Sequence, residues 1–238
     1  MDKKSLVDER IKAIISSRHS NPLLHEAIEY ALFPSGKRIR PVFCLLSCEA
    51  VSGDFISALD VAVAIEFIHT YSLIHDDIMD EDIERRGKSS LYKKYGIPIA
   101  ILVGDGFLTL GFEILSDYPE ISKKVAVACG IEGMVLGQFE EIVKIQKQEK
   151  INLNKTAKLF SVSCVAGGMI GGGTKEEVEA LERFGINFGL SFQIKDEIMD
   201  GEEGDEKRLY FLLDKAKSSL SIFGERGKGL EDMLHYFE

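Results

Sequence analysis

The sequence predicts an all-α protein, and three observations carry that prediction. Long segments are rich in Leu, Ile, Ala, Glu and Lys, which favour helices. Only five prolines occur to interrupt them. No stretch alternates apolar and polar side chains for long, as a half-buried strand would. The 238 residues, 45% of them hydrophobic, are enough for one sizeable core, so residues 1–238 are expected to form a single domain.

Proline, glycine and asparagine mark where the expected helices begin and end. Pro22, Pro98 and Pro119 each suit the first turn of a helix, because an N–H group is not needed there. Asn152 or Asn154 is expected to cap a further helix. The expected helices cover, in order, residues 4–18, 22–31, 38–51, 54–84, 98–115, 119–148, 155 to a glycine-rich break at 167–174, and 176–200, followed by one amphipathic helix and a short terminal one. Glycines at 130, 133 and 137 are expected to let a neighbouring helix approach closely.

Two acidic pentads end two of these helices, Asp76-Asp77-Ile78-Met79-Asp80 and Asp196-Glu197-Ile198-Met199-Asp200. Asp76 and Asp80 are four residues apart, so they share one helix face. Stacked carboxylates repel one another, so two matched copies indicate divalent cations held between two helices. Carboxylate oxygens without Cys or His favour Mg²⁺ or Mn²⁺. The expected ligands are Asp76, Asp77, Asp80, Asp196, Glu197 and Asp200; two solvated helix ends are the alternative.

A basic stretch precedes the third expected helix. Lys37, Arg38 and Arg40 crowd a helix N-terminus, where backbone N–H groups are also available. That combination binds phosphate well. A basic helix start on the surface, with no ligand, is the alternative.

Composition limits the classes of partner. The net charge of −10 argues against a nucleic-acid-binding surface, although bound metal ions can still attract an anionic substrate. None of the four cysteines forms a CxxC pair, so reduced thiols and a cytoplasmic location are expected. The polar N-terminus does not look like a signal peptide. The most apolar stretch, residues 97–115, contains Asp105 and Glu113, so no membrane span is expected.

Five motifs occur in a characteristic order: Gly36-Lys37-Arg38-Ile39-Arg40-Pro41, the first pentad followed by Arg85-Arg86, Gly137-Gln138, Lys155-Thr156, and Phe192-Gln193-Ile194-Lys195-Asp196-Glu197. Together they resemble the trans-isoprenyl diphosphate synthases, which make geranyl, farnesyl and geranylgeranyl diphosphate. The first looks like that family's GKRxRP motif, and the second like its first aspartate-rich motif, DDxxD…RR. The resemblance runs from about Leu24 to Asp200.

The resemblance implies a fold, a reaction and roles for individual residues. The fold would be an isoprenoid synthase-type bundle of about ten helices around a central cavity. The enzyme would be a homodimeric, Mg²⁺-dependent prenyltransferase that joins isopentenyl diphosphate to an allylic diphosphate. Isopentenyl diphosphate would be bound by Gly36, Lys37, Arg40, His69 and Arg86. The allylic diphosphate would be bound by Arg85, Lys155, Thr156, Gln193 and Lys207. Catalysis would depend on Asp76, Asp77, Asp80, Lys155 and Asp196.

The chain departs from the family pattern at four places. Glu141 stands where the family commonly has an aspartate. The family has two glycines before the lysine of the first motif, whereas Ser35 replaces the first of them here. The second pentad carries Glu197 in place of an aspartate. After Asp200 the chain is shorter than the family pattern, so Lys207 is the main candidate for the lysines of the missing loop, and Lys195 is a weak one. Two other functions therefore stay open, a regulatory or partly active subunit of a heteromeric prenyl synthase and a terpene cyclase-like enzyme.

Residues before the first pentad are expected to set product length. In the resembled family, bulky residues there form the floor of the product pocket. Tyr71 lies five residues before Asp76, about 7.5 Å lower on a helix, and the small Ser72 follows it. Ile68 is the next limit, one turn deeper. This pattern indicates farnesyl to geranylgeranyl diphosphate as product; packing of Tyr71 against a neighbouring helix is the alternative.

Overall fold

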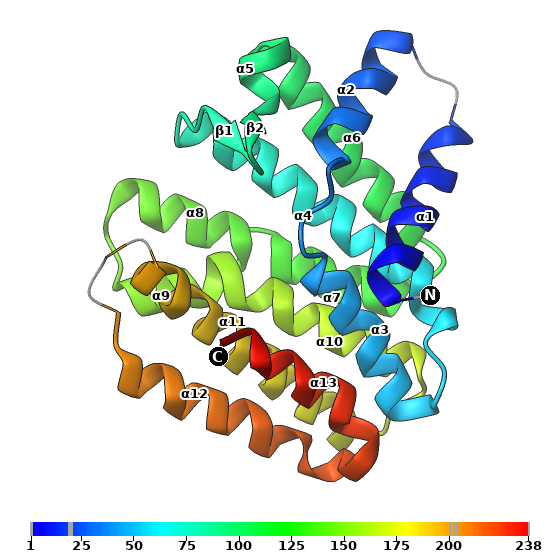
Figure 1. Ribbon diagram of the computed structural model, residues 1–238, viewed down its shortest axis with the longest axis vertical. Helices are drawn as coiled ribbons and strands as arrows, with labels where there is room; N and C mark the ends of the chain where they lie inside the picture. Colours follow the sequence, from blue (N-terminus) through cyan, green and yellow to red (C-terminus); the bar gives the residue numbers. More distant parts are fainter. Residues whose placement is uncertain (1, 19–20, 200, 202–203, 238) are drawn as a thin grey trace. The chain divides into compact units, whose positions relative to one another are not determined.

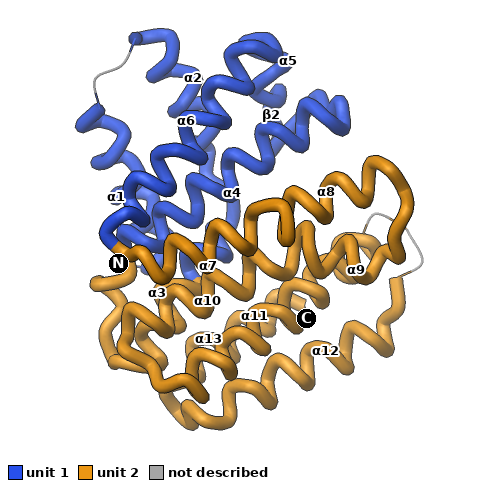
Figure 2. The backbone as a smooth tube through the Cα atoms, turned by 180° about the vertical axis from the view of Figure 1, so that it is seen from behind, with its two compact units in different colours: residues 1–42, 59–117 blue, residues 43–58, 118–238 orange. Residues whose placement is uncertain are grey.

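The computed structural model describes residues 2–18, 21–199, 201 and 204–237. Its helices confirm the all-α prediction (Figure 1). The chain forms two compact units (Figure 2). Unit 1 contains residues 1–42 and 59–117, and unit 2 contains residues 43–58 and 118–238. The first acidic pentad and the basic stretch therefore belong to unit 1, and the second pentad begins in unit 2.

Unit 1 is built around helix α4. Its elements are α1 (Lys3–Ser16), α2 (Pro22–Leu32), the start of α3 (Ile39–Ser52), α4 (Leu59–Met79), β1 (Glu84–Arg85), β2 (Lys88–Ser89), α5 (Leu91–Tyr95) and α6 (Ile97–Leu115). Residues 61–68 of α4 are all buried. The ring of Phe67 stacks on that of Phe107 of α6, with centroids 5.6 Å apart. Gly111 of α6 leaves room for Ile68, since a Cβ there would lie 2.7 Å from Ile68 Cγ1. These contacts fix α4 along α6.

The helix that carries the first pentad is shorter than expected. It follows a 3₁₀ turn, Ile56–Ala58, and ends at Met79, so the expected helix 54–84 was wrong at both ends. A short antiparallel hairpin of β1 and β2 follows, where no sheet was expected. Arg86 and Gly87 form its two-residue loop and both have positive φ, 56° and 74°. Such a loop suits the twist of a hairpin, and the local pattern gave no sign of two-residue strands.

Unit 2 is built around helices α10 and α11, which pack along each other. Its elements are the rest of α3, the turn 56–58, α7 (Pro119–Cys129), α8 (Met134–Val143), α9 (Gln148–Asn152), the π-helix η2 (Leu153–Ala157), α10 (Lys158–Ile170), α11 (Lys175–Met199), α12 (Glu206–Ser219), η3 (Leu220–Gly227), α13 (Lys228–Asp232) and η4 (Met233–Phe237). Four fully buried phenylalanines form the centre: Phe43, Phe160, Phe184 and Phe188. The rings of Phe43 and Phe188 are 4.5 Å apart.

Two expectations for unit 2 were wrong. The expected helix 119–148 is divided into α7 and α8. A Cβ on Gly133 would lie 1.9 Å from the Ala128 carbonyl oxygen, so the backbone turns where only glycine fits. Asn152 and Asn154 do not cap a helix, because α9, η2 and α10 follow one another without a break. The close approach expected at Gly137 is confirmed, since a Cβ there would lie 2.4 Å from the Lys155 backbone nitrogen.

Two helical segments of the described chain, Ile56–Met79 and Ile97–Leu115, are long and apolar enough to cross a membrane. The protein buries 61% of the most apolar window of the first and 28% of that of the second. Core helices of soluble proteins pass the same test of length and composition.

All four cysteines are buried as thiols, and all four lie in unit 2: Cys44, Cys48, Cys129 and Cys164. Burial raises the pKa of Cys44 well above its usual value, and the neighbouring sulfurs of Cys48 and Cys164 raise it further. Burial also raises the pKa of Cys164 to about 12. These thiols therefore stay protonated at neutral pH.

Candidate functional site

A cluster of basic residues in unit 1, which we call the basic pocket, brings together most of the residues expected to bind isopentenyl diphosphate. Arg40 Nη1 lies 3.0 Å from His69 Nε2. A Cβ on Gly36 would lie 3.0 Å from Arg86 Nε, so the Arg86 guanidinium rests against the Gly36 backbone. Lys37 is exposed on the same loop. Residues far apart in the sequence thus place two guanidinium groups and an imidazole near one short stretch of backbone.

The imidazole of His69 is neutral in this pocket. Arginine can only donate, so Nε2 of His69 accepts the hydrogen bond from Arg40 and carries no proton. Burial lowers the pKa of His69 well below its usual value. Nearby guanidinium groups lower it further, in the order Arg40, Arg86, Arg38 and Arg85. The arginines supply the positive charge of the pocket, which therefore favours an anion at neutral pH.

The three carboxylates of the first acidic pentad have different surroundings. The Asp80 N–H donates to the Asp76 carbonyl oxygen at 2.8 Å, so the helical turn continues and the two side chains share a face. Asp80 is exposed and Asp76 half-buried. Asp77 is only 3% exposed, and its Oδ1 accepts from Arg85 Nε at 2.7 Å. Burial raises the pKa of Asp77, against the effect of Arg85. Asp77 is thus engaged as the ion-pair partner of Arg85.

The residues expected to set product length lie on α4 below the pentad. The ring of Tyr71 is half-buried, with its centroid 4.6 Å from that of His75. His75 in turn lies against α6, because a Cβ on Gly104 would be 2.6 Å from its Nε2. Ile68 is fully buried. Ser72 donates a hydrogen bond to the His69 carbonyl oxygen at 2.9 Å.

In unit 2 the second pentad is held from α9. Asn152 Nδ2 donates to Glu197 Oε1 at 2.9 Å. Asp196 is half-buried, and Asp200 lies outside the described residues. Lys195, just before the pentad, donates from Nζ to the Phe237 carbonyl oxygen at 3.2 Å. Glu197 therefore has a fixed orientation, which comes from a residue that sequence reasoning had placed as a helix cap.

Three of the residues expected to bind the allylic diphosphate form pairs in unit 2, with partners on α8, η2 and α11, whereas Arg85 lies in β1 and pairs with Asp77. Lys155 Nζ forms an ion pair with Glu141. Thr156 Oγ1 donates to Gln193 Oε1 at 3.1 Å. Lys155 and Thr156 lie in the π-helix η2, a geometry that is frequent at functional sites. Lys207 is exposed on α12.

Sequence reasoning missed the buried ion pair of Arg38 and Glu66 and the buried position of Gln138. Arg38 is 3% exposed, so it does not share the solvent-facing position of Lys37. Its ion-pair partner Glu66 is 1% exposed. A glutamate within the otherwise apolar run 61–68 was a visible signal of such a buried pair. Gln138 is 7% exposed, and its side-chain amide has no hydrogen-bond partner among the residues that the structure describes.

The carboxylates present suit a hard divalent cation. Within the described part of the chain, no three His, Cys, Asp or Glu side chains come together as a complete metal site. Mg²⁺ does not require one, since it is usually bound by one or two carboxylates together with substrate phosphates and water. Asp76 and Asp80 offer such a pair on one helix face.

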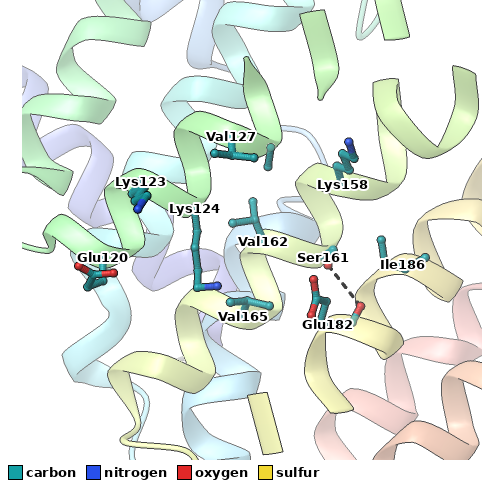
Figure 3. A pocket seen from close by; sticks show the side chains of 11 residues that line it. Glu120, Lys123, Lys124, Val127, Lys158, Ser161, Val162, Val165, Glu182 and Ile186 are labelled. Carbon is teal, nitrogen blue, oxygen red and sulfur yellow. Dashed lines mark hydrogen bonds between the residues drawn. The ribbon is translucent and has the colours of Figure 1, made fainter. Parts of the chain in front are cut away.

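A separate cavity of about 430 Å³ opens in unit 2 between α7, α10 and α11 (Figure 3). Val162 and Val165 lie on its α10 side, and Lys124 extends toward Val165 (Figure 3). The Nζ of Lys158 donates to the Glu132 carbonyl oxygen. None of the residues expected from the sequence to bind substrate or metal lines this cavity.

Comparison with known proteins identifies relatives over most of this chain. A family model described as polyprenyl synthetase matches residues 21–209. Geranylgeranyl pyrophosphate synthase 7, chloroplastic, from Arabidopsis thaliana is 39% identical over 225 residues, which cover 86% of this chain and 64% of that protein. Farnesyl diphosphate synthase from Geobacillus stearothermophilus is 37% identical over 224 residues, which cover 87% of this chain and 75% of that protein. This chain thus spans less than two thirds of the length of the plant relative.

The fold comparison agrees with the sequence comparison. The crystal structure of a geranyltransferase from Legionella pneumophila superposes with a TM-score of 0.89 at 29% sequence identity. The superposition covers 99% of this chain and 94% of that one. The family model covers more than half of the chain, and the bacterial relative is matched over three quarters of its length. The chain belongs to the polyprenyl synthetase family.

Proposed function

We propose that the protein is a prenyltransferase that condenses isopentenyl diphosphate with an allylic diphosphate to give a short-chain isoprenyl diphosphate. The observation that carries the proposal is the basic pocket of unit 1. There Arg40 and a neutral His69 lie 3.0 Å apart, and Arg86 rests against Gly36. A diphosphate needs several donors at close quarters, and guanidinium groups provide them in a fixed plane.

In this proposal the pocket holds the diphosphate of isopentenyl diphosphate. The side chains of Arg40, Arg86 and Lys37 donate to its oxygens. Because Gly36 has no side chain, both Arg86 and the diphosphate can lie next to its backbone. His69 orients Arg40 through its unprotonated Nε2. Because His69 is neutral, it accepts this hydrogen bond without adding to the repulsion among the arginines.

The acidic residues are proposed to act on the allylic diphosphate. Asp76 and Asp80 would hold Mg²⁺ or Mn²⁺ together with Asp196, Glu197 and Asp200. When bound, the metal supplies positive charge that stabilises the departing diphosphate. Asp77 is better placed to hold Arg85 beside the pentad than to bind metal directly, since it is buried against that guanidinium.

The remaining donors are proposed to hold the allylic substrate by its diphosphate. This role is proposed for five residues: Lys155, Thr156, Gln193, Arg85 and Lys207. The Lys155–Glu141 pair would open when the substrate arrives, because a diphosphate offers the ammonium group more negative charge than one carboxylate. No side-chain nucleophile is required, since the diphosphate leaves the allylic carbon and the double bond of isopentenyl diphosphate attacks that carbon. The released diphosphate then accepts the proton that the product loses.

The proposed products are farnesyl to geranylgeranyl diphosphate. Tyr71 is the proposed stop, and Ile68 is the next limit. The half-buried ring of Tyr71 is supported from behind by His75, whose position is fixed against Gly104. A supported ring resists displacement by a growing chain better than a mobile one.

A homodimer is the proposed working form. Helix α6 is rich in apolar residues, as a core helix would be. Three of its large apolar side chains are nevertheless exposed, Ile97 by 48%, Ile101 by 40% and Leu102 by 65%. A second copy of the same face would remove this apolar surface from water. We also propose that residues 1–238 act as one synthase domain, and that the cytoplasm is its compartment, because buried thiols persist in a reducing environment.

One assay tests the reaction. Purified protein is incubated with Mg²⁺, labelled isopentenyl diphosphate and, in turn, dimethylallyl, geranyl and farnesyl diphosphate, and the products are separated by chain length. Transfer of label to an acid-labile prenyl diphosphate supports the proposal. A regulatory subunit would transfer no label alone, and a cyclase would release diphosphate from the allylic substrate without using isopentenyl diphosphate.

A further inference from the structure

Arg38, in the middle of the basic stretch, points into unit 1 and is held there by three groups. Its side chain is fully buried. Nε donates to Asp8 Oδ1 at 2.9 Å, and Nη2 donates to the Leu32 carbonyl oxygen at 2.9 Å. Nη1 donates to Glu66 Oε1. All three guanidinium nitrogens of Arg38 are therefore engaged in hydrogen bonds.

The backbone of Arg38 explains why this anchoring matters. Its φ is 54°, in the left-handed region that a side chain bearing a Cβ rarely adopts. Such a conformation costs free energy and persists when surrounding contacts hold it. The turn at Arg38 separates Lys37 from Arg40, so it determines the direction in which both side chains leave the backbone.

Asp8 of α1 ties the same loop at a second point. Ser35 Oγ donates to Asp8 Oδ2 at 2.7 Å, while Arg38 uses the other oxygen. Ser35 is the residue that replaces the first glycine of the family motif. One carboxylate on α1 therefore holds the loop on both sides of Gly36, the residue against which Arg86 rests.

Glu66 connects this anchor to the pocket. It lies one helical turn before His69 on α4 and is 1% exposed. Its charge acts on Arg86 as well as on Arg38, since it raises the pKa of Arg86 against the effect of burial. Glu66 is thus a buried counter-charge shared by the anchor and by a guanidinium of the pocket.

We infer that Asp8, Ser35, Arg38 and Glu66 form a positioning network for the isopentenyl diphosphate pocket, in which Arg38 binds no substrate but fixes the loop that presents Lys37 and Arg40. The inference rests on the proposed function for the identity of the substrate. Helix α1 and Ser35 are not among the residues expected to bind substrate. In this inference they help to position the residues that bind the diphosphate.

The decisive experiment separates stability from positioning with a single and a double variant. Arg38→Met leaves Glu66 buried without its partner, so the melting temperature should fall by about 10 °C. In Arg38→Met/Glu66→Leu both charges are gone, and the melting temperature should recover to within about 4 °C of wild type. The KM for isopentenyl diphosphate should nevertheless stay raised about tenfold in the double variant, because the released loop costs Lys37 or Arg40 one charge-assisted contact with the diphosphate. The KM for the allylic substrate should change by less than about twofold, because that substrate uses other donors.

Asp8→Asn and Asp60→Asn form a matched pair. Asp60 also accepts from α1, through Arg10 Nε at 2.6 Å, but does not touch the loop 33–38. Asp8→Asn should raise the KM for isopentenyl diphosphate, whereas Asp60→Asn should leave both KM values unchanged. A double variant with wild-type stability and wild-type KM for isopentenyl diphosphate would overturn the inference, as would equal increases for both substrates.

Binding of inorganic pyrophosphate keeps this test separate from the proposed reaction. If the wild-type protein transfers no prenyl group, the proposed function fails. Calorimetric titration of pyrophosphate into wild type, the double variant and Asp60→Asn then decides the inference by itself. A loss of affinity in the double variant alone supports the network, and equal affinity in all three overturns it.

Discussion

Replacing Gly36 by alanine adds one methyl group at the point where Arg86 meets the basic loop. The new Cβ would lie 3.0 Å from Arg86 Nε and 3.1 Å from Cζ and Nη2. These separations are shorter than ordinary van der Waals contact, so the guanidinium must move away by a few tenths of an ångström. The φ of Gly36 is not in the left-handed region, so alanine causes no backbone strain. The effect should therefore fall on Arg86 rather than on the fold.

The size of the effect follows from the bond that Arg86 would make to substrate. A charge-assisted hydrogen bond contributes about 1.5–3 kcal/mol and weakens steeply as its partners separate. Loss of the lower value corresponds to a rise of about tenfold in the KM for isopentenyl diphosphate. The KM for the allylic substrate should change by less than about twofold, because Arg86 is not among its proposed donors.

Steady-state kinetics with each substrate varied in turn measures this difference, and thermal unfolding monitors the fold. Gly106→Ala is the control, because a Cβ there meets nothing within 4 Å. It should leave both KM values unchanged and stabilise α6 by about 0.5–1 kcal/mol. An unchanged KM for isopentenyl diphosphate in Gly36→Ala, with the fold intact, would refute the assignment of Arg86 to this substrate.

Three further predictions concern the metal, product length and pH. Asp80→Ala should abolish prenyl transfer without lowering the melting temperature, because it removes an exposed carboxylate that repels Asp76; substantial turnover in the variant would contradict a metal-binding role. Tyr71→Ala should lengthen the products seen by chromatography, with Ile68 as the new limit, and an unchanged distribution would place the pocket floor elsewhere. The pKa of His69 is lower in the folded protein than the usual value of 6.5, so the unfolded chain binds more protons below that pH. The free energy of unfolding measured in urea should therefore have its full value above pH 6.5 and fall toward pH 5 by up to about 1.4 kcal/mol per pH unit. In His69→Asn this decline should be smaller.

The local sequence predicted those parts of the site that depend on helix periodicity and capping. The shared face of Asp76 and Asp80 follows from a spacing of four, and the start of α2 follows from Asn21 and Pro22. Gly137 was expected to permit a close helix approach, and it does so against the backbone of Lys155.

What the sequence could not predict depends on partners distant in the chain. Arg38 has the same charge as its neighbours in the basic stretch, but Asp8, 30 residues earlier, and Glu66, 28 residues later, hold it inward. Asn152 has the composition of a helix cap, but its side chain meets Glu197, 45 residues later. The end of α4 at Met79 depends on the hairpin that follows, whose loop residue Arg86 has a positive φ that the local pattern did not indicate.

The location of the buried cysteines gives each unit a different response to thiol-modifying reagents. All four cysteine thiols lie in unit 2 and none in unit 1, and burial raises the pKa values of Cys44 and Cys164. A reagent that needs a solvated thiolate can react only when unit 2 opens. The rate of alkylation under native conditions therefore measures the opening of unit 2, while unit 1 gives no signal. Comparing that rate with global unfolding would show whether the two units open together or one before the other.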